Sequence, residues 1–248
     1  MIVCVGLATR DTIYVVPNHP EPDGRVVASE RVVAGGGPAA TAAVTIARLG
    51  GDVRFVGVIE GELEGVDVVS LPGRMTESTI LVSGRSRTIV TEEAAALDIP
   101  PDALDGADWV HVDHVGYPSL PSVLDAKLSV DAGNPIPDLD VAKVAVYAPT
   151  AALDDGRRGE ITVVTRGGQG CTAYAGGETI DVPHFPVDVV STLGAGDVFH
   201  GALVACLDRG LELRDALVRA NVCAALSCRA LDGRSAIPTW DELEAAVE

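Results

Sequence analysis

Short apolar runs recur along this chain with helix-like segments between them, and this alternation limits the fold more than any other feature of the sequence. The runs are rich in β-branched residues and bounded by Gly, Asp or Pro, which is typical of buried strands. They cover residues 2–6, 53–58, 109–112, 128–131, 144–147 and 161–165. Strands that alternate with helices predict an α/β fold in which helices cover both faces of a mostly parallel sheet.

Several segments between and after these runs have the composition and end signals of helices. The clearest is residues 38–49, which is rich in Ala, Val, Ile and Leu and stops at Gly50 and Gly51. The other predicted helices are residues 197–207, 213–229 and 240–247. A length of 248 residues suits one large α/β domain or two small ones. We interpret it as one domain, residues 1–248.

Two pairs of segments alternate between apolar and polar residues, as half-exposed antiparallel strands do. Residues 12–16 pair with 25–33, and residues 79–82 pair with 87–91 through a turn at 83–86. Because both pairs leave the core and return to it, we expect a small β-sheet lid, about residues 12–33 and 79–91, over one end of the sheet. Exposed strand edges are a liability unless they are paired, so we predict a homodimer joined through the lid.

The charge balance excludes several classes of partner. Acidic residues outnumber basic ones by 36 to 18, and lysine occurs only at Lys127 and Lys143. A nucleic-acid backbone or an anionic membrane needs clustered basic residues, so we expect neither partner. A phosphate would have to be bound by backbone amides, a metal ion and a few arginines. The five cysteines show no pairing or metal-ligand spacing, and no run resembles a signal peptide or spanning helix, so we expect a cytoplasmic protein with reduced thiols.

The sharpest local motif is Ser-Thr-Leu-Gly-Ala-Gly-Asp at residues 191–197, directly before an apolar helix. Gly194 and Gly196 flank Ala195, so three successive backbone N–H groups lie free of bulky side chains at a helix start, where they can bind an anion. An isolated aspartate there is most often a capping residue. Beside an anion-binding loop, Asp197 is also suited to accept a proton from a hydroxyl that attacks a phosphate.

Residues 191–201 closely resemble the C-terminal signature of the ribokinase-like, or PfkB, carbohydrate kinases. The family pattern Asp-Thr-x-Gly-Ala-Gly-Asp-x-Phe matches at every position but the first. Three more segments resemble family motifs in the family's order: Gly35-Gly36-Gly37-Pro38-Ala39-Ala40 before a helix, residues 163–170, and residues 233–238. The four motifs together make the resemblance specific.

The resemblance implies a ribokinase-like sandwich in which ATP and a sugar meet at residues 194–197. Asp197 would be the catalytic base, and the amides of Gly194, Ala195 and Gly196 would stabilise the transferring phosphoryl group. The implied sugar ligands are Asp11, Gly36, Gly37 and Thr41. The implied nucleotide-side residues are Thr165, Gly168, Gly170, Thr192, Asn221 and Gly233. Structural alternatives stay open: Asp11 as a turn residue, the glycines as a tight turn, and Asn221 as an ordinary polar residue of a helix face.

The implied substrate is a small sugar. Residues 11–14, 35–50, 187–203 and 234–238 look most like the ketohexokinase and sulfofructose kinase branches. Arg25 falls where the sulfofructose enzymes carry a cation near the anionic end of the substrate, although a solvated arginine is the more common arrangement. His114 stands where those enzymes have an arginine, which argues against strict sulfonate specificity. We therefore expect a ketohexose or a related small sugar.

Three departures from the family pattern bear on cofactors and on the sheet. Ser191 replaces an aspartate, which argues against activation by a monovalent cation. Residues 148–153 lack the Asn-x-x-Glu motif that organises Mg²⁺, so Mg²⁺ would come with ATP and no metal ligand is assigned. Residues 60–67 and 150–160 are short where relatives have helical connections, so the sheet would be less covered.

Two other functions stay open. A nucleoside kinase on the same scaffold would need an aromatic pocket for the base, but only 4% of the residues are aromatic and Tyr14 alone lies near the start of the lid. A sugar- or nucleotide-binding protein that has lost catalysis would explain the missing Asn-x-x-Glu motif. The intact Asp197 and its glycine loop favour a kinase over a binding protein that has lost catalysis.

Overall fold

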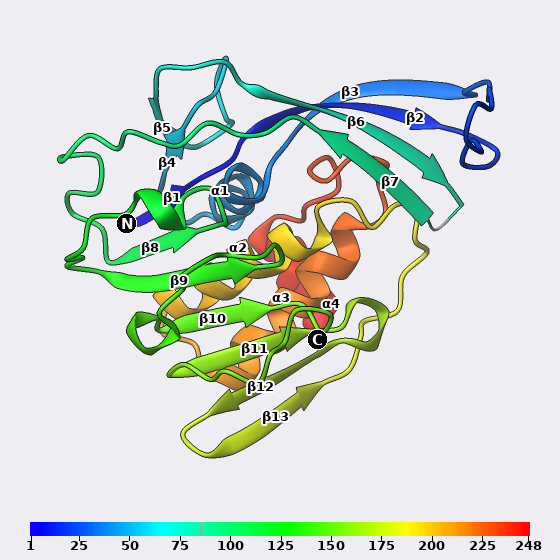
Figure 1. Cartoon of the computed structure of the whole chain (residues 1–248). Helices are drawn as coiled ribbons and strands as arrows, with labels where there is room; N and C mark the ends of the chain where they lie inside the picture. Colours follow the sequence, from blue (N-terminus) through cyan, green and yellow to red (C-terminus); the bar gives the residue numbers. More distant parts are fainter. Residues whose placement is uncertain (85) are drawn as a thin grey trace.

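The larger sheet of the protein holds nine strands, as seen in a computed structural model that describes residues 1–84 and 86–248 (Figure 1). Their order is β13-β12-β11-β10-β9-β8-β1-β4-β5. The strands from β5 to β11 pair in parallel, whereas β12 and β13 are antiparallel. The bounds are β1 Ile2–Val5, β4 Val53–Gly57, β5 Asp67–Ser70, β8 Trp109–Val112, β9 Lys127–Ala132, β10 Val146–Pro149, β11 Ile161–Thr165, β12 Cys171–Ala175 and β13 Glu178–Val182. The predicted mostly parallel sheet is confirmed.

The predicted helices are also confirmed, and they pack together against one face of the sheet (Figure 1). They are α1 Pro38–Arg48, α2 Ala195–Asp208, α3 Leu213–Ser227 and α4 Trp240–Val247. Helix α2 lies between α1 and α3 and contacts β8 and β9. The five cysteines are free and buried. None of the helices in the described chain has the length and apolar character needed to cross a membrane.

The other face of the sheet lacks the α-helical layer that we expected. In the part of the chain that the structure describes, no α-helix contributes to the apolar cluster on this face. Loop residues such as Leu104, Leu120 and Leu139 cover it, together with the 3-10 turns Tyr117–Ser119 and Val141–Lys143. Residues 60–67 and 150–160 contain no helix. The strand connections on this side are too short for full helices, so loops bury the apolar side chains instead.

The lid is a second sheet with the order β3-β2-β6-β7, drawn at the top of Figure 1. Its strands are β2 Thr9–Val15, β3 Glu30–Gly36, β6 Thr76–Ser83 and β7 Ser86–Thr91. Two antiparallel hairpins, β2–β3 and β6–β7, join through a parallel pairing of β2 with β6. The first pair of strands begins before and ends after the predicted 12–33, and the second pair begins before the predicted 79 and ends at the predicted 91. The predicted turn at residues 83–86 includes residue 85, which lies outside the described residues.

One face of the lid is buried against the C-terminal part of the chain. Ile13, Ile80 and Val82 pack with Leu193 and Leu231. These side chains share a face because Ile13 pairs with Ile80 across the parallel strands and Val82 lies two residues further along β6. The lid is therefore closed onto the loop that contains the glycine motif. This contact holds the lid and the glycine loop, which form two sides of the candidate site, next to each other.

Candidate active site

The glycine motif forms a tight loop before α2, as its sequence predicted. Gly194 has φ +71°, a conformation that favours glycine, and is the N-cap of the helix. A Cβ atom added to Gly194 would lie 2.9 Å from the Cα of Gly233, so these two glycines let two loops pack backbone to backbone. At Gly196 an added Cβ would meet nothing within 4 Å. The Ala195 N–H donates a 3.4 Å hydrogen bond to the Thr192 carbonyl oxygen, whereas no partner among the described residues is found for the N–H groups of Gly194 and Gly196. Unpaired amides at a helix start beside open space suit an anion.

Asp197 lies in the first turn of α2 and is half-buried. Burial raises the pKa of its carboxyl group to about 8, and the nearby negative charge of Asp131 acts in the same direction. The positive charges of His200 and Arg234 oppose these effects. A carboxyl group with such a pKa can exchange a proton near neutral pH, which is the property required of a general base.

A buried ion pair lies one helical turn beyond Asp197. His200 Nδ1 is 2.9 Å from Asp131 Oδ2, and both side chains are almost completely buried. Burial alone would lower the pKa of His200, but the carboxylate of Asp131 raises it overall. The same pairing lowers the pKa of Asp131. Behind the pair, His111 lies 3.1 Å from Ser129 Oγ through its Nδ1, and burial lowers the pKa of this histidine to about 4.

Asp113 is a buried carboxyl group that holds the backbone together at the ends of β1 and β8. It accepts hydrogen bonds from the backbone N–H groups of Leu7, Ala39, Val115 and Gly116, at 2.8 to 3.2 Å. Burial raises its pKa, although these N–H groups and the neighbouring histidine favour the charged form. The lid, α1 and the sheet are thereby fixed relative to one another. Sequence reasoning assigned no role to Asp113, because its partners are up to 106 residues away.

Asp11 lies on the inner face of the lid, as expected for a residue that faces a substrate. It is 6% exposed and accepts a 2.7 Å hydrogen bond from Thr9 Oγ1. Burial raises its pKa, whereas Thr9 and Arg234 favour the charged form. A Cβ atom added to Gly36 would come within 2.7 Å of Asp11 Cγ, so only glycine leaves room for this carboxyl group. Gly37 has φ +90° and is the N-cap of α1.

Arg234 joins the C-terminal loop to both α1 and the lid. Its Nη2 donates a 2.6 Å hydrogen bond to the carbonyl oxygen of Gly36, and its Nε donates a 3.1 Å bond to Thr41 Oγ1. Burial lowers the pKa of Arg234 to about 10, while Asp11 and Asp197 favour its charged form. Thr41 is thus used to hold Arg234. Arg234 lies in the motif at residues 233–238, but the sequence did not predict a role for it. Its contact with Gly36 spans 198 residues, and such a contact leaves no local signal.

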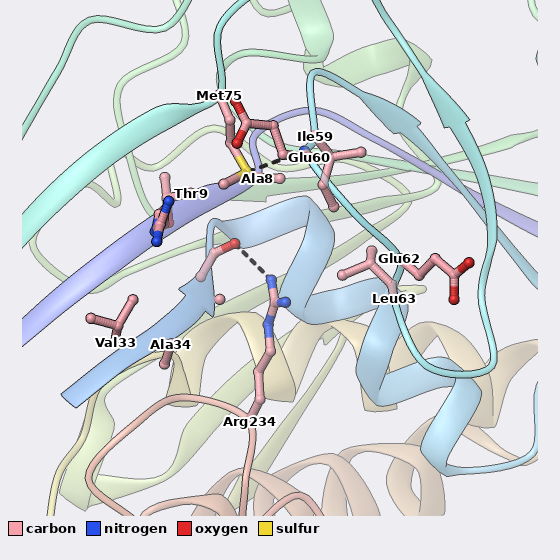
Figure 2. Close-up of a pocket in the computed structure, with 13 residues that line it drawn as sticks. Ala8, Thr9, Val33, Ala34, Ile59, Glu60, Glu62, Leu63, Met75 and Arg234 are labelled. Carbon is pink, nitrogen blue, oxygen red and sulfur yellow. Dashed lines mark hydrogen bonds between the residues drawn. The ribbon is translucent and has the colours of Figure 1, made fainter.

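A cavity of about 380 Å³ lies between the lid, the loop after β4 and Arg234 (Figure 2). In Figure 2, the side chain of Arg234 extends toward the end of β3. Glu62 and Leu63 lie on the side of Arg234 that is away from β3. Arg10 and Glu60 also line it, so its charges are mixed. Asp11 and Asp197 are not among the described residues that line this space.

The predicted nucleotide-side residues fall into two places. Thr192 and Gly233 belong to the two loops that meet at Gly194, beside the anion-binding amides. Gly170 packs against the backbone of Val182 and Pro183, and the Asn221 side-chain amide donates a hydrogen bond to the Pro183 carbonyl oxygen. Asn221 is therefore held by the chain itself. Thr165 ends β11, and an added Cβ at Gly168 in the turn that follows would meet nothing within 4 Å.

Two predicted sugar-site residues stand apart from the rest. Arg25 was expected in a lid strand, but it is exposed in the irregular segment before β3. Residues 20–28 are rich in Pro, Glu, Asp and Gly at their start, and they form a loop instead of pairing with β2. His114 follows Asp113 and is half-buried, and its Nδ1 is buried without a hydrogen-bond partner among the described residues.

A phosphate-transferring enzyme binds a phosphate group and a metal ion, and the described residues suit these two groups to different degrees. The unpaired amides of Gly194 and Gly196 fit a phosphate group, because they lie at a helix start and Gly196 leaves the space free. Within residues 1–84 and 86–248, no group of three or more His, Cys, Asp or Glu side chains is placed to hold a metal ion.

Comparison with known proteins agrees with this geometry. A model of the pfkB family carbohydrate kinases matches residues 1–134 and 136–240. Ribokinase of Bacillus subtilis (strain 168) is 25% identical over 286 aligned residues, which cover 98% of each protein. Ketohexokinase of Mus musculus is 25% identical over 276 residues, which cover 87% of this chain and 92% of the relative.

A solved structure shares the whole fold. Ribokinase from Thermotoga maritima superposes with a TM-score of 0.80 at 23% identity, and the match covers 100% of this chain and 99% of that one. At this identity the likeness concerns the arrangement of the chain: a large, mostly parallel sheet with helices, and a smaller lid sheet.

Proposed function

The chain belongs to the pfkB family of carbohydrate kinases, and we propose that it transfers the γ-phosphoryl group of ATP to a hydroxyl group of a ketohexose or a related small sugar. The observation that carries this proposal is the position of Asp197. Its carboxyl group, with a pKa of about 8, lies in the first turn of a helix whose unpaired amides, at Gly194 and Gly196, would form an anion site. A proton acceptor and a phosphate site thus occur within three residues.

The sugar would lie between the lid and the start of α1. Asp11 can accept hydrogen bonds from sugar hydroxyl groups, and Gly36 and Gly37 let the backbone approach a ligand closely. Arg234 fixes this wall by binding the Gly36 carbonyl oxygen and Thr41. These contacts would hold one hydroxyl group near Asp197, which gains rate by orientation.

Asp197 in its ionised form would remove the proton from that hydroxyl group as the oxygen attacks the phosphorus. The amides of Gly194, Ala195 and Gly196 would hold the oxygens of the transferring group, where the helix dipole favours negative charge. When bound, ATP supplies the phosphoryl group, and the Mg²⁺ that accompanies it offsets phosphate charge. Thr192, Gly168, Gly170, Thr165 and Gly233 would face the rest of the nucleotide.

Two other functions remain candidates. A nucleoside kinase would need a base-binding surface, and the 4% content of aromatic residues argues against one. A binding protein without catalysis would have no use for the raised pKa of Asp197 beside free amides. A small-sugar kinase therefore accounts for more of the observed features of the site than either alternative function does.

We also propose that two copies pair through the lid and that the protein works in a reducing compartment such as the cytoplasm. All six residues of β7 are exposed, and Ile89 and Val90 on this edge strand are 46% and 67% exposed. An exposed apolar edge strand is a ready surface for pairing. Five free, buried cysteines suit a reducing environment.

Replacement of Asp197 by asparagine tests the proposed reaction. The wild type should release ADP only when the right sugar is present in a panel of ketohexoses, sulfofructose, ribose and nucleosides. D197N should lose about 10²- to 10⁴-fold in kcat and still bind the sugar. The matched control is D208N at the exposed C-terminal end of the same helix, which should keep wild-type activity. Absence of sugar-dependent ADP release by the wild type would favour the binding protein.

A further inference from the structure

The side chain of Arg234 lies where the cavity of Figure 2 meets the two carboxyl groups of the candidate site. Arg234 lines the cavity, whereas Asp11 and Asp197 are not among the described residues that do so. The charges of both carboxyl groups nevertheless act on the guanidinium group. A ligand that extends from Asp197 into the cavity therefore passes beside Arg234.

One edge of the guanidinium group is held by the chain, and the other edge is free. Nη2 donates a 2.6 Å hydrogen bond to the carbonyl oxygen of Gly36, and Nε donates a 3.1 Å bond to Thr41 Oγ1. A guanidinium group has five N–H donors in a rigid fork, so these two bonds leave the edge formed by Nη1 and Nη2 available. No partner for Nη1 is found among the described residues. A Cβ atom added to Gly35 would lie 2.6 Å from Nη1, so this glycine leaves room for the free edge.

The positive charge of Arg234 has no carboxylate in direct contact. None of the ion pairs formed within residues 1–84 and 86–248 includes this arginine. The side chain is half-buried, and burial lowers its pKa to about 10, so water compensates the charge only in part. A charge that is removed from water is costly unless it is paired. An anionic ligand would supply the missing partner.

The other charged side chains of the cavity do not supply it. Arg10, Glu60 and Glu62 line the cavity, but all three are exposed. Exposed charges are screened by water and salt, and they cost little when they are left unpaired. The sign of the ligand is therefore set by the half-buried guanidinium group. Its two parallel N–H groups on the free edge match the two oxygens of a planar carboxylate.

We propose that Arg234 binds the carboxylate of a sugar acid, whose carboxylate lies in the cavity and whose hydroxyl groups lie beside Asp11 and Asp197. The proposal rests on the proposed kinase function and narrows its small sugar to one that carries a carboxylate. The cavity volume of about 380 Å³ is in the range of small-molecule sites. Asp11 and Asp197 repel an anion, so the carboxylate has to stay on the cavity side of Arg234.

The competing explanation is that Arg234 only braces the C-terminal loop against the lid and α1. Loss of a brace would misplace Gly36 and Thr41, which would weaken the binding of neutral and anionic sugars by the same factor. Loss of a carboxylate ligand would weaken the binding of the anionic sugar selectively, because a neutral sugar has no charged group for the free edge. The ratio of the two affinities therefore distinguishes the two roles.

The test uses two substrates that differ only at C1, where D-fructose has a hydroxymethyl group and 2-keto-D-gluconate has a carboxylate. kcat/KM is measured by ADP release, and sugar binding is measured by calorimetry without ATP. The wild type should prefer 2-keto-D-gluconate by about 10²-fold in both measurements. R234A should lose about 10²- to 10³-fold for this acid and less than about tenfold for D-fructose. R234K, which keeps the charge without the fork, should lie between R234A and the wild type.

The matched control is R229A. Arg229 is exposed in the same C-terminal part of the chain, and its Nε donates to the carbonyl oxygen of Leu226, away from the cavity. R229A should keep the wild-type preference for the acid. Melting temperatures are compared for all variants, and R234K decides the outcome if R234A does not fold.

Two results would overturn the proposal. One is an equal loss for both sugars in the Arg234 variants, as a brace would give. The other is a wild type that binds D-fructose, or its 6-deoxy-6-sulfonate, at least as tightly as 2-keto-D-gluconate. Calorimetry needs no turnover. A wild type that binds the acid through Arg234 but releases no ADP with any sugar would therefore refute the proposed function and leave the carboxylate site standing.

Discussion

The addition of one methyl group at Gly36, in the variant G36A, should impair sugar binding and leave the fold of the lid intact. Gly36 does not have a positive φ, so alanine can adopt its backbone conformation. Its Cβ, however, would lie 2.7 Å from Asp11 Cγ and 2.7 Å from Thr9 Oγ1. The atom that the Cβ would overlap most is Asp11 Oδ2. Ordinary van der Waals contact begins near 3.4 Å, so this carboxylate oxygen has to retreat by about 1.4 Å.

We expect G36A to weaken substrate binding more than it lowers the stability of the fold. Asp11 can turn away about its side-chain bonds, so the fold should survive G36A with a small change in melting temperature. A displacement of about 1 Å or more at a group that orients the substrate costs about 10²-fold in rate. Loss of one hydrogen bond to a charged group costs about 1.5–3 kcal/mol, which is a factor of the same size. We therefore expect G36A to lower kcat/KM for the sugar by about ten- to a hundredfold.

The assay is sugar-dependent ADP release, with sugar and ATP varied in turn. The KM for ATP should stay near its wild-type value, because the nucleotide binds at the other end of the site. D11A and the D11A/G36A double variant complete a double-mutant cycle. If G36A acts by displacing Asp11, the double variant should be no worse than D11A. A kcat/KM for sugar within threefold of wild type in G36A, or losses that multiply in the double variant, would refute this reasoning.

Two further predictions concern pH and assembly. kcat/KM should fall as the pH drops through about 8, because Asp197 becomes protonated there. D131N should move this midpoint to lower pH, since the Asp131 charge raises the pKa of Asp197 more than His200 lowers it; an unchanged midpoint would contradict the assignment. In light scattering, the protein should have twice the mass of one chain, and V90E on the exposed strand β7 should give a monomer. A wild-type monomer at working concentration would rule out pairing through the lid.

Local pattern was enough to predict most of the large sheet and all of the helices. The predicted strands 109–112 and 161–165 have the observed bounds of β8 and β11, because buried parallel strands are continuous apolar runs. The edge strand β5 was missed, since none of its four residues is buried and its sequence carries no such run. The hairpin of β12 and β13 was also missed. Its turn, Gly176-Gly177, has positive φ at both residues.

Some residues of the candidate site are close together in the sequence, whereas others come together only in the folded chain. Asp197 and Gly194–Gly196 lie within four residues, so spacing alone indicated an anion site with a carboxyl group beside it. Asp113 and the Asp131–His200 pair could not be inferred, because their partners come from other strands and helices. The predicted strand at residues 25–33 was wrong at its start: the pairing of β2 with β3 begins only at Glu30, so Arg25 lies in the loop before it.

The charges of the site show why the net charge of −18 does not prevent phosphate binding here. Each carboxyl group is compensated in a different way: Asp113 by backbone N–H groups, Asp131 by His200, and Asp11 by Thr9 and Arg234. Asp197 has no hydrogen-bond donor among the described residues, and burial together with the charge of Asp131 raises its pKa to about 8. An arriving phosphate chain would raise that pKa further and hold the base in its protonated form. A cation that arrives at the same time as the phosphate would reverse this effect, so the electrostatics that suit Asp197 to its role also require that phosphate and positive charge enter the site together.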